Sequence, residues 1–355
     1  MTGRVRLARR LQWLCNAVAV LLVAGCARPL PTGVTELVYA SPYAPSHPFS
    51  KADQTWIRFV EARSGGRLRI RPVWSGALIS SDMSMEELRH GVADIGLITP
   101  IYVRGGTQLI RTQAGFYSGA RSVETQVSLY RCMAAAEPEF ARETKGLVVL
   151  AVQGGSLPGV VTRTRPVRSL ADLKGLRLRA PSELTRVLER LGADPVNMPM
   201  AEVYSAMAKG VIDGVVAPAD TFKALHFAEV SRYFNTLAVP RGAYPARAMN
   251  LARWNALSPA DRAVLAEGQA VWEAALAHDV GAALGAGLDE ARRRGVAISP
   301  MPAADQARFD ALYLEDARTD AAGLSRYGLD GTRAFEVARA SVGADGTVAC
   351  RERQS

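Results

Sequence analysis

The chain has 355 residues, about twice the length of a typical ~150-residue domain, so two lobes are the first expectation. Hydrophobic residues make up 48% and charged residues 22%, which excludes an intrinsically disordered chain and a multi-span membrane protein. The formal net charge is +9, but Arg4, Arg6, Arg9 and Arg10 fall within the first 25 residues, and the other basic residues are spread along the chain. Aromatic and basic residues are not interleaved, so no nucleic-acid partner is expected.

The N-terminus has the pattern of a secretory signal. An apolar stretch at residues 14–23 follows the arginines and is shorter than the ~20 residues of a membrane span. Its end reads Leu-Val-Ala-Gly-Cys26, which resembles a bacterial lipobox with a lipidated cysteine; an ordinary signal peptide with a chance cysteine is the alternative. We expect a signal peptide at 1–25 and a tether at 26–35 that holds the protein to a membrane surface through its lipid.

The remaining cysteines suggest a disulfide. Cys15 lies in the signal and Cys26 in the lipobox, which leaves Cys132 and Cys350. A secreted protein enters an oxidising compartment, so a bridge between these two would clip the C-terminal tail to the body of the protein. Two unrelated thiols are the alternative.

Strand and helix patterns alternate from residue 34 onward. A continuous apolar run at 147–152 favours a strand that is covered on both faces. In the first half we expect strands at 37–40, 68–73, 95–98 and 147–152, and helices at 50–63, 83–90 and 121–143.

A second unit begins near residue 158 and continues the alternation. There we expect a helical turn at 169–174, strands at 176–179 and 211–216, an extended segment at 196–199, and helices at 181–191 and 201–209. This order predicts a mostly parallel α/β sheet. Ser258, Pro259 and Asp261 then open a helix that can run to about Arg294. At 1.5 Å per residue it would be ~50 Å long, enough to brace two lobes.

These elements give the expected domain organisation. Lobe I covers 36–157, with part of the segment 247–300 returning to it, and lobe II covers 158–246. The bridging helix covers 258–294, and a C-terminal helical segment and tail cover 295–355.

Motifs of catalytic and metal sites are absent from the sequence. The four histidines show no metal-ligand spacing, and the chain has no CxxC, Walker A or GxSxG motif. The sequence therefore predicts no catalytic residue, no metal and no cofactor.

Residues 169–214 contain several short motifs at fixed spacings. They read SLADLKGLRLRAP at 169–181, LGA at 191–193, PM at 199–200, EVY at 202–204 and GVIDG at 210–214. This pattern closely resembles the substrate-binding proteins of TRAP (tripartite ATP-independent periplasmic) transporters, the DctP-like family, and flanking matches extend the resemblance over roughly 36–300. The resemblance implies a periplasmic-binding-protein-like fold, in which two α/β lobes share a long helix that spans both. It also implies a cleft that closes on a small organic acid.

The resemblance places Arg179 at the ligand-arginine position of that family. A planar guanidinium can hold a carboxylate through two parallel hydrogen bonds. Arg177 lies two residues earlier and points to the same side of the strand, so the residues alone do not separate the two. Only the match to the family favours Arg179.

The chain departs from the family pattern at three positions. Ala217 stands where many relatives carry Asn, and Met200 stands where Trp or Phe is common. A second cleft arginine, which some sugar-acid binders have, would fall near Gly159. We therefore expect a pocket less polar than that of a sialic-acid binder. Its ligand would be a monocarboxylate such as a 2-oxo, hydroxy or aromatic acid, with a dicarboxylate left open.

Further ligand contacts are expected where the strands of lobe I end, because such positions face the cleft in open α/β sheets. Core packing or loop anchoring is the alternative for each. The candidates at or near these strand ends are Thr99, Tyr102, Tyr43, His47 and Trp74. Phe116 and Tyr117 are further candidates, as an aromatic wall. Glu202, Tyr204 and Asp213 match the family but are expected to serve structure.

The function implied by the resemblance is that of a solute receptor in the periplasm that delivers a small organic acid to the membrane subunits of a TRAP permease. The lipobox adds an anchor to the membrane through lipid. Two alternatives remain open: a sensory receptor that presents its ligand to a membrane kinase, and an enzyme that reuses the same two lobes. The absence of a base–nucleophile set argues against the enzyme.

Overall fold

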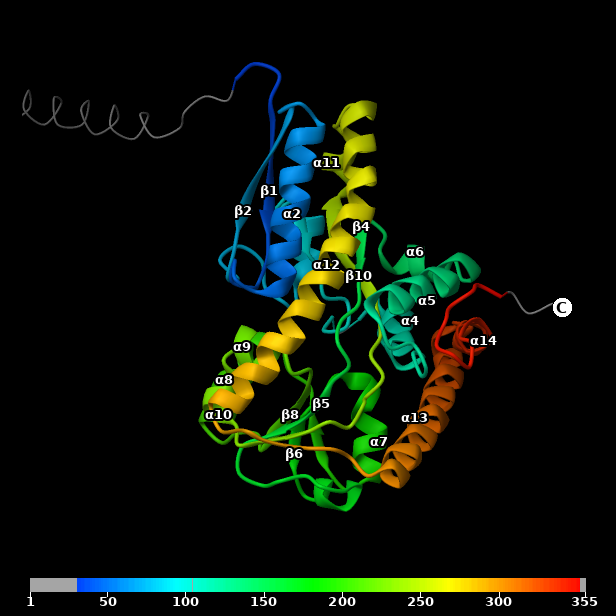
Figure 1. Cartoon of the computed structure of the whole chain (residues 1–355). Coiled ribbons are helices and arrows are strands. Elements are labelled where there is room, and N and C mark those ends of the chain that lie inside the picture. Colours follow the sequence, from blue (N-terminus) through cyan, green and yellow to red (C-terminus); the bar gives the residue numbers. More distant parts are fainter. Residues whose placement is uncertain (1–30, 104, 352–355) are drawn as a thin grey trace, which may run out of the picture.

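The computed structural model describes residues 31–103 and 105–351 and contains two β-sheets (Figure 1). The first sheet has the strand order β2-β1-β3-β10-β4 and the second has the order β11-β9-β5-β8-β6-β7. The first sheet consists of β1 (Thr35–Ala40), β2 (Leu68–Val73), β3 (Ile95–Leu97), β4 (Leu147–Gln153) and β10 (Tyr244–Asn250). The second consists of β5 (Gly159–Thr162), β6 (Arg177–Arg179), β7 (Asp194–Val196), β8 (Gly214–Ala217), β9 (Tyr233–Asn235) and β11 (Ala297–Ser299). The predicted signal peptide and Cys26 lie outside the described residues.

Each sheet forms a lobe with the helices around it. The first lobe holds α2 (Pro48–Arg63), α3 (Ser84–Arg89), α4 (Gln108–Thr112), α5 (Val123–Ala136), α6 (Glu139–Glu143) and α11 (Leu251–Asn255). The second lobe holds α7 (Thr185–Arg190), α8 (Met200–Ala208), α9 (Thr221–Ala224) and α10 (Phe227–Val230). Three helices complete the chain: α12 (Pro259–Arg293), α13 (Ala303–Gly323) and α14 (Gly331–Ser341). The predicted α/β fold of two lobes is confirmed.

Most helices and strands lie within a few residues of the predicted positions, and two segments differ. The helix expected at 121–143 is divided into α5 and α6, because Glu137 before Pro138 adopts an extended conformation, which the proline ring imposes on its predecessor. The segment after residue 295, expected to be helical, opens with β11, which pairs in parallel with β9.

Both sheets are mostly parallel, as predicted, with one strand of each running in the opposite direction. In the first sheet β10 is antiparallel to both of its neighbours, and in the second sheet β5 is antiparallel to β8 and β9. The chain forms β5 directly after it crosses from the first lobe to the second, and β10 directly after it crosses back. Such a strand runs away from the boundary between the lobes, whereas the strands beside it run toward that boundary.

The long helix α12 passes from the first lobe to the second, as predicted (Figure 1). Ser258 accepts a hydrogen bond from the backbone N–H of Asp261 at 3.1 Å, and Pro259 occupies the first turn, so the helix starts as the sequence indicated. It packs against α2 and β4 in the first lobe and against α9 and β11 in the second.

Its contact with the first lobe is built around a buried ion pair. Asp53 of α2 accepts hydrogen bonds from Arg247 of β10 at 2.6 Å and from the indole N–H of Trp272 of α12 at 2.7 Å. The guanidinium of Arg247 also lies over the Trp272 ring, 4.5 Å from the ring centroid.

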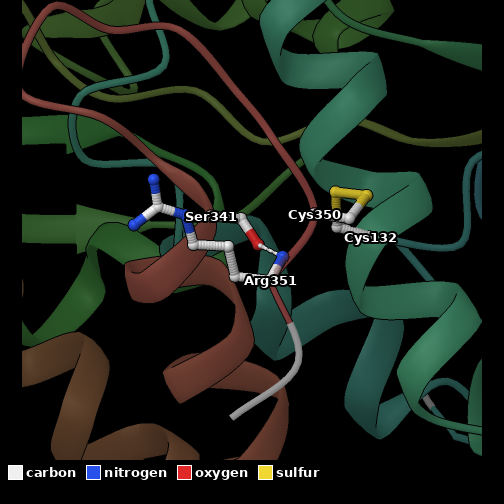
Figure 2. The surroundings of a disulfide bond; sticks show 4 residues. All are labelled: Cys132, Ser341, Cys350 and Arg351. Atoms are coloured by element: carbon white, nitrogen blue, oxygen red, sulfur yellow. Dashed lines mark hydrogen bonds between the residues drawn. A yellow bond between two sulfur atoms is a disulfide. The ribbon is translucent and has the colours of Figure 1, made fainter. Parts of the chain in front are cut away.

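The C-terminal segment is a second connection between the lobes. Helix α13 packs against α7 of the second lobe, and α14 packs against α5 of the first lobe. In the structure Cys132 of α5 and Cys350 of the tail form a disulfide, with their Cα atoms 5.1 Å apart (Figure 2). Beside it, the backbone N–H of Arg351 donates to the Ser341 hydroxyl at the end of α14.

Among the helices of the described residues, none has the length and apolar character needed to cross a bilayer.

Candidate ligand-binding pocket between the lobes

A pocket of about 90 Å³ lies where the two lobes meet. In the first lobe it is lined by the segments that follow β1 and β3, and in the second lobe by β6, β8 and nearby helices. The segments in which the chain crosses between the lobes line it as well. Its wall is largely apolar, with a few polar and charged side chains directed at one space. Those side chains are Tyr43, His47, Tyr102, Arg179, Glu183, Asp220, Thr221, Arg241 and Tyr244.

Arg179 is the most constrained cation of this pocket. It is only 2% exposed, at the end of β6, and its Nε donates to the Met198 carbonyl at 3.0 Å. Its Nη2 donates to the Tyr102 hydroxyl of the opposite lobe at 2.8 Å. No described residue accepts a hydrogen bond from its Nη1, which leaves that group for a ligand.

The structure shows that Arg179, and not Arg177, lines the pocket, which the strand pattern alone could not decide. The Arg177 side chain is exposed and lies 3.6 Å from Asp194, whereas Arg179 reaches the pocket. The carboxylate of Asp213 accepts from the Arg177 backbone N–H at 2.8 Å and so closes the turn before β8.

On the first lobe, Tyr43 and His47 form one stacked unit, with ring centroids 4.1 Å apart. The backbone N–H of Phe49 donates to Nδ1 of His47 at 3.2 Å at the start of α2, so Nε2 carries the proton of the neutral ring. Burial, together with the charges of Arg247 and Arg241, lowers the pKa of His47 to about 3. Burial also raises the pKa of the Tyr43 hydroxyl. Both side chains are therefore neutral hydrogen-bond donors at neutral pH.

Two acidic side chains of the second lobe also face the pocket. Glu183 follows β6 and Asp220 follows β8. Each has a buried carboxylate oxygen without a hydrogen-bond partner among the described residues. Burial raises the pKa of Glu183 to about 7 and also raises the pKa of Asp220. Sequence reasoning did not select either residue, because both lie outside the family motifs.

The second-lobe wall agrees only in part with the sequence prediction. Met200, at the first turn of α8, lines the pocket. Ala217 does not, which corrects its assignment: side chains alternate along β8, so Val216 faces the pocket while Ala217 packs into the core on the other side of the sheet. Gly159 has no room for a side chain, because a Cβ there would lie 2.4 Å from the Asn235 carbonyl oxygen.

Four aromatic or hydroxyl candidates of the first lobe are placed away from the pocket, which corrects the prediction for them. Thr99 is 2% exposed and bonds through its hydroxyl to the Ser81 carbonyl, so it anchors a loop. Trp74 packs edge-to-face on Tyr39, with ring centroids 5.6 Å apart.

Phe116 and Tyr117 belong to the core beneath α14. Phe116 packs against Phe335 with ring centroids 5.3 Å apart, and the hydroxyl of Tyr117 lies 2.8 Å from Gln113 Oε1. Their sequence neighbourhood could not distinguish a cleft wall from a core contact.

The second arginine of the pocket, Arg241, was not predicted. It lies between β9 and β10, in the segment that returns the chain to the first lobe. The signal available in the sequence was its place in a crossing segment, because such segments necessarily border the space between lobes.

Two motif residues, Glu202 and Tyr204, lie outside the pocket. The Tyr204 hydroxyl donates to Glu229 at 3.0 Å, and Glu202 lies in the first turn of α8. Within residues 31–103 and 105–351, no group of three or more His, Cys, Asp or Glu side chains is arranged to hold a metal ion.

Comparison with known proteins identifies the family. The family model described as bacterial extracellular solute-binding protein, family 7 (DctP) matches residues 39–315, and the chain belongs to this family. This confirms the resemblance to TRAP solute-binding proteins. It is a family of extracellular solute-binding proteins.

Individual relatives agree with this assignment. A TRAP solute-binding protein from Rhodoferax ferrireducens, solved with copurified benzoate, superposes with a TM-score of 0.80 at 25% identity and covers 86% of this chain and 97% of its own. A solute-binding protein from Albidiferax ferrireducens is 28% identical over 181 residues, 50% of this chain and 52% of the relative. The 2,3-diketo-L-gulonate-binding periplasmic protein YiaO of Escherichia coli is 33% identical over 121 residues, 33% of this chain and 36% of its own. The chain thus spans about half the length, or less, of these two curated relatives.

Proposed function

We propose that this protein is an extracytoplasmic solute receptor that binds a small organic acid between its lobes and delivers it to a TRAP-type membrane permease. The observation that carries the proposal is Arg179, a buried guanidinium at the lobe boundary that is hydrogen-bonded to Tyr102 of the opposite lobe. A guanidinium that is buried from solvent can bind a carboxylate through charge-assisted hydrogen bonds, because water screens these charges poorly there.

The contact between Arg179 and Tyr102 also links ligand binding to closure. Because the Tyr102 hydroxyl accepts from Arg179, its own proton is free to donate to a carboxylate held by the arginine. A ligand that contacts both residues at once is bound only when the lobes are together. Such a ligand shifts the population toward the closed form, which is the form that a permease can recognise.

The size and wall of the pocket indicate a small ligand. The cavity of about 90 Å³ is small beside the ~300–1,000 Å³ of sites for drug-sized molecules. The apolar part of the wall, which includes Phe49, Ile101 and Met200, suits an aliphatic chain or a single ring. The benzoate bound by the relative from Rhodoferax ferrireducens supports an acid of this kind. We infer a receptor without catalytic activity.

A thermal-shift screen of residues 27–355 against small organic acids tests the proposal. A ligand at 100 times its dissociation constant stabilises by ~2.7 kcal/mol, which raises the unfolding temperature of a protein of this size by a few degrees. We expect a selective shift from one class of acid. Mass spectrometry of the denatured protein checks for an acid already in the pocket. No shift from any acid, together with an empty pocket, would refute the proposal.

We further propose a periplasmic protein anchored through lipid on Cys26, on the basis of the lipobox resemblance alone. On this proposal the signal peptide of residues 1–25 is cleaved off, and the lipidated Cys26 becomes the first residue. Metabolic labelling with a fatty acid should mark the wild-type protein and not Cys26→Ala. Equal labelling of both proteins would contradict the anchor.

A further inference from the structure

A second guanidinium, that of Arg241, lines the same pocket as Arg179 but comes from a different part of the chain. Arg241 lies in the segment that returns from β9 to β10, whereas Arg179 ends β6. The chain also crosses between the lobes in the segment from β4 to β5. The two crossing segments are joined, because the backbone N–H of Val239 donates to the Pro158 carbonyl at 3.0 Å. Arg241 therefore faces the pocket from the boundary between the lobes rather than from the second sheet.

The hydrogen-bond donors of Arg241 have no protein acceptor among residues 31–103 and 105–351. The other two arginines of this region are satisfied differently: Arg179 donates to Met198 and Tyr102, and Arg247 is paired with Asp53. With the described residues Arg241 forms neither a hydrogen bond nor an ion pair, although its charge contributes to the lowered pKa of His47. A guanidinium carries five N–H donors, and in a pocket these need acceptors.

The acidic residues of the pocket do not supply those acceptors. The charge of Arg241 acts on the carboxyl groups of Glu183 and Asp220, but neither carboxylate lies within ion-pair distance of it. Both have a buried oxygen without a partner, and burial raises both pKa values, which favours their uncharged forms. The positive charges of Arg179 and Arg241 are thus left for a ligand to balance.

The Arg241 guanidinium lies directly against the backbone of Gly155. A Cβ atom on Gly155 would lie 2.5 Å from Cζ of Arg241 and 2.7 Å from its Nε, so the guanidinium rests directly on the glycine. Gly155 is itself held by Gln126, whose side chain accepts from the Gly155 N–H at 2.8 Å and donates to its carbonyl at 3.0 Å. Any larger residue at 155 would push the guanidinium away from this place.

We propose that Arg241 is a second anion contact, and that it determines which acids the receptor takes. This inference rests on the proposed function. The carboxylate of the ligand binds Arg179, and a second oxygen acceptor of the same small molecule binds Arg241: a 2-oxo group, a hydroxyl group or a second carboxylate. An acid without such an oxygen leaves the Arg241 donors without an acceptor, and a site built to hydrogen-bond a group discriminates strongly against analogues that lack it.

Matched pairs of acids that differ only in the second oxygen test the inference. The probes are propanoate against pyruvate and lactate, phenylacetate against mandelate, and butanoate against succinate, each titrated by calorimetry. A hydrogen bond to a charged group corresponds to about a 10- to 100-fold difference in affinity. We expect the wild-type protein to bind the oxygenated member of at least one pair tighter by that factor.

Variants assign the preference to Arg241. Arg241→Met should bind both members of that pair with similar affinity, because only the oxygenated member loses a contact. Gly155→Ala keeps the charge but displaces the guanidinium, so it should reduce the same preference. The control is Arg69→Met, which removes an exposed arginine from the edge strand β2 and should leave the preference unchanged. Circular dichroism and thermal unfolding confirm that each variant is folded.

The outcomes separate this inference from the proposed function. If an acid binds, Arg179→Met abolishes its binding and Arg241→Met leaves the preference intact, the inference about Arg241 is overturned while the receptor function stands. A wild-type protein that binds every pair without preference overturns it as well. If none of the acids binds and mass spectrometry of the denatured protein finds the pocket empty, the receptor proposal fails, and the role of Arg241 fails with it.

Discussion

Replacing Asp53 with alanine tests the contact that fixes α12 to the first lobe. Asp53 is fully buried and accepts hydrogen bonds from Arg247 at 2.6 Å and from Trp272 at 2.7 Å. These three residues come from α2, β10 and α12, so one carboxylate joins the first sheet, a helix that covers it and the helix that spans both lobes.

The expected magnitude follows from what the substitution leaves behind. Arg247 is 3% exposed, and without Asp53 its remaining acceptors are the Ala246 carbonyl at 3.0 Å and Gln153 at 3.3 Å. Removing one partner of a buried ion pair typically costs ~3–5 kcal/mol, because the other charge stays buried without compensation. That is a large part of the ~5–15 kcal/mol by which proteins are stable.

Urea unfolding followed by tryptophan fluorescence measures the loss, and a double-mutant cycle attributes it. We expect Asp53→Ala and Arg247→Met each to lose ~3–5 kcal/mol, and the double variant to lose less than the sum of the two, because it leaves no unpaired charge. Asp53→Asn keeps an acceptor and should cost less than Asp53→Ala. Losses below ~1 kcal/mol, or strict additivity in the cycle, would refute this reasoning.

Two further predictions concern the disulfide and a buried acid. Residues 27–355, denatured without reductant, should show no free thiol, because Cys132 and Cys350 are joined. Two free thiols would contradict the bridge. The Cys350→Ser variant should lose ~2–5 kcal/mol of unfolding free energy. Burial raises the pKa of Glu183 to about 7 from an ordinary value of 4.5. Between these two pH values the folded protein keeps a proton on Glu183 that the unfolded chain releases. The stability of the folded protein therefore falls as the pH rises from 4.5 through 7. Glu183→Gln should therefore be more stable relative to the wild-type protein at pH 8 than at pH 5, and the same difference at both pH values would speak against the raised pKa.

The elements that the sequence predicted well have strong local signals. Strand β2 alternates apolar and basic side chains from Leu68 to Val73, and α12 begins at a Ser258-Pro259 cap, so both are found where the pattern placed them. Strand β11 has only three residues and no periodicity of its own, and its conformation is set by pairing with β9.

The site was predictable only as far as the family pattern reached. Arg179 and Met200 lie inside the matched motifs, and both line the pocket. Arg241 lies outside those motifs, and its contact with the pocket depends on how two crossing segments pack together. Phe116 and Tyr117 carry side chains that suit a ligand wall and a core equally well. Their place beneath α14 depends on contacts with residues more than a hundred positions away, such as Phe335 and Ala243.

The central claim is that the buried guanidinium at the end of β6 binds the carboxylate of a small acid. Isothermal titration of the acid that gives the largest thermal shift, into wild-type protein, Arg179→Met and Arg177→Met, tests it most directly. Arg177 supplies a matched control, because it lies in the same strand but is exposed beside Asp194. The account predicts that Arg179→Met, although folded, loses measurable binding, while Arg177→Met binds like the wild-type protein. Unchanged affinity in Arg179→Met, or an equal loss in both variants, would contradict it.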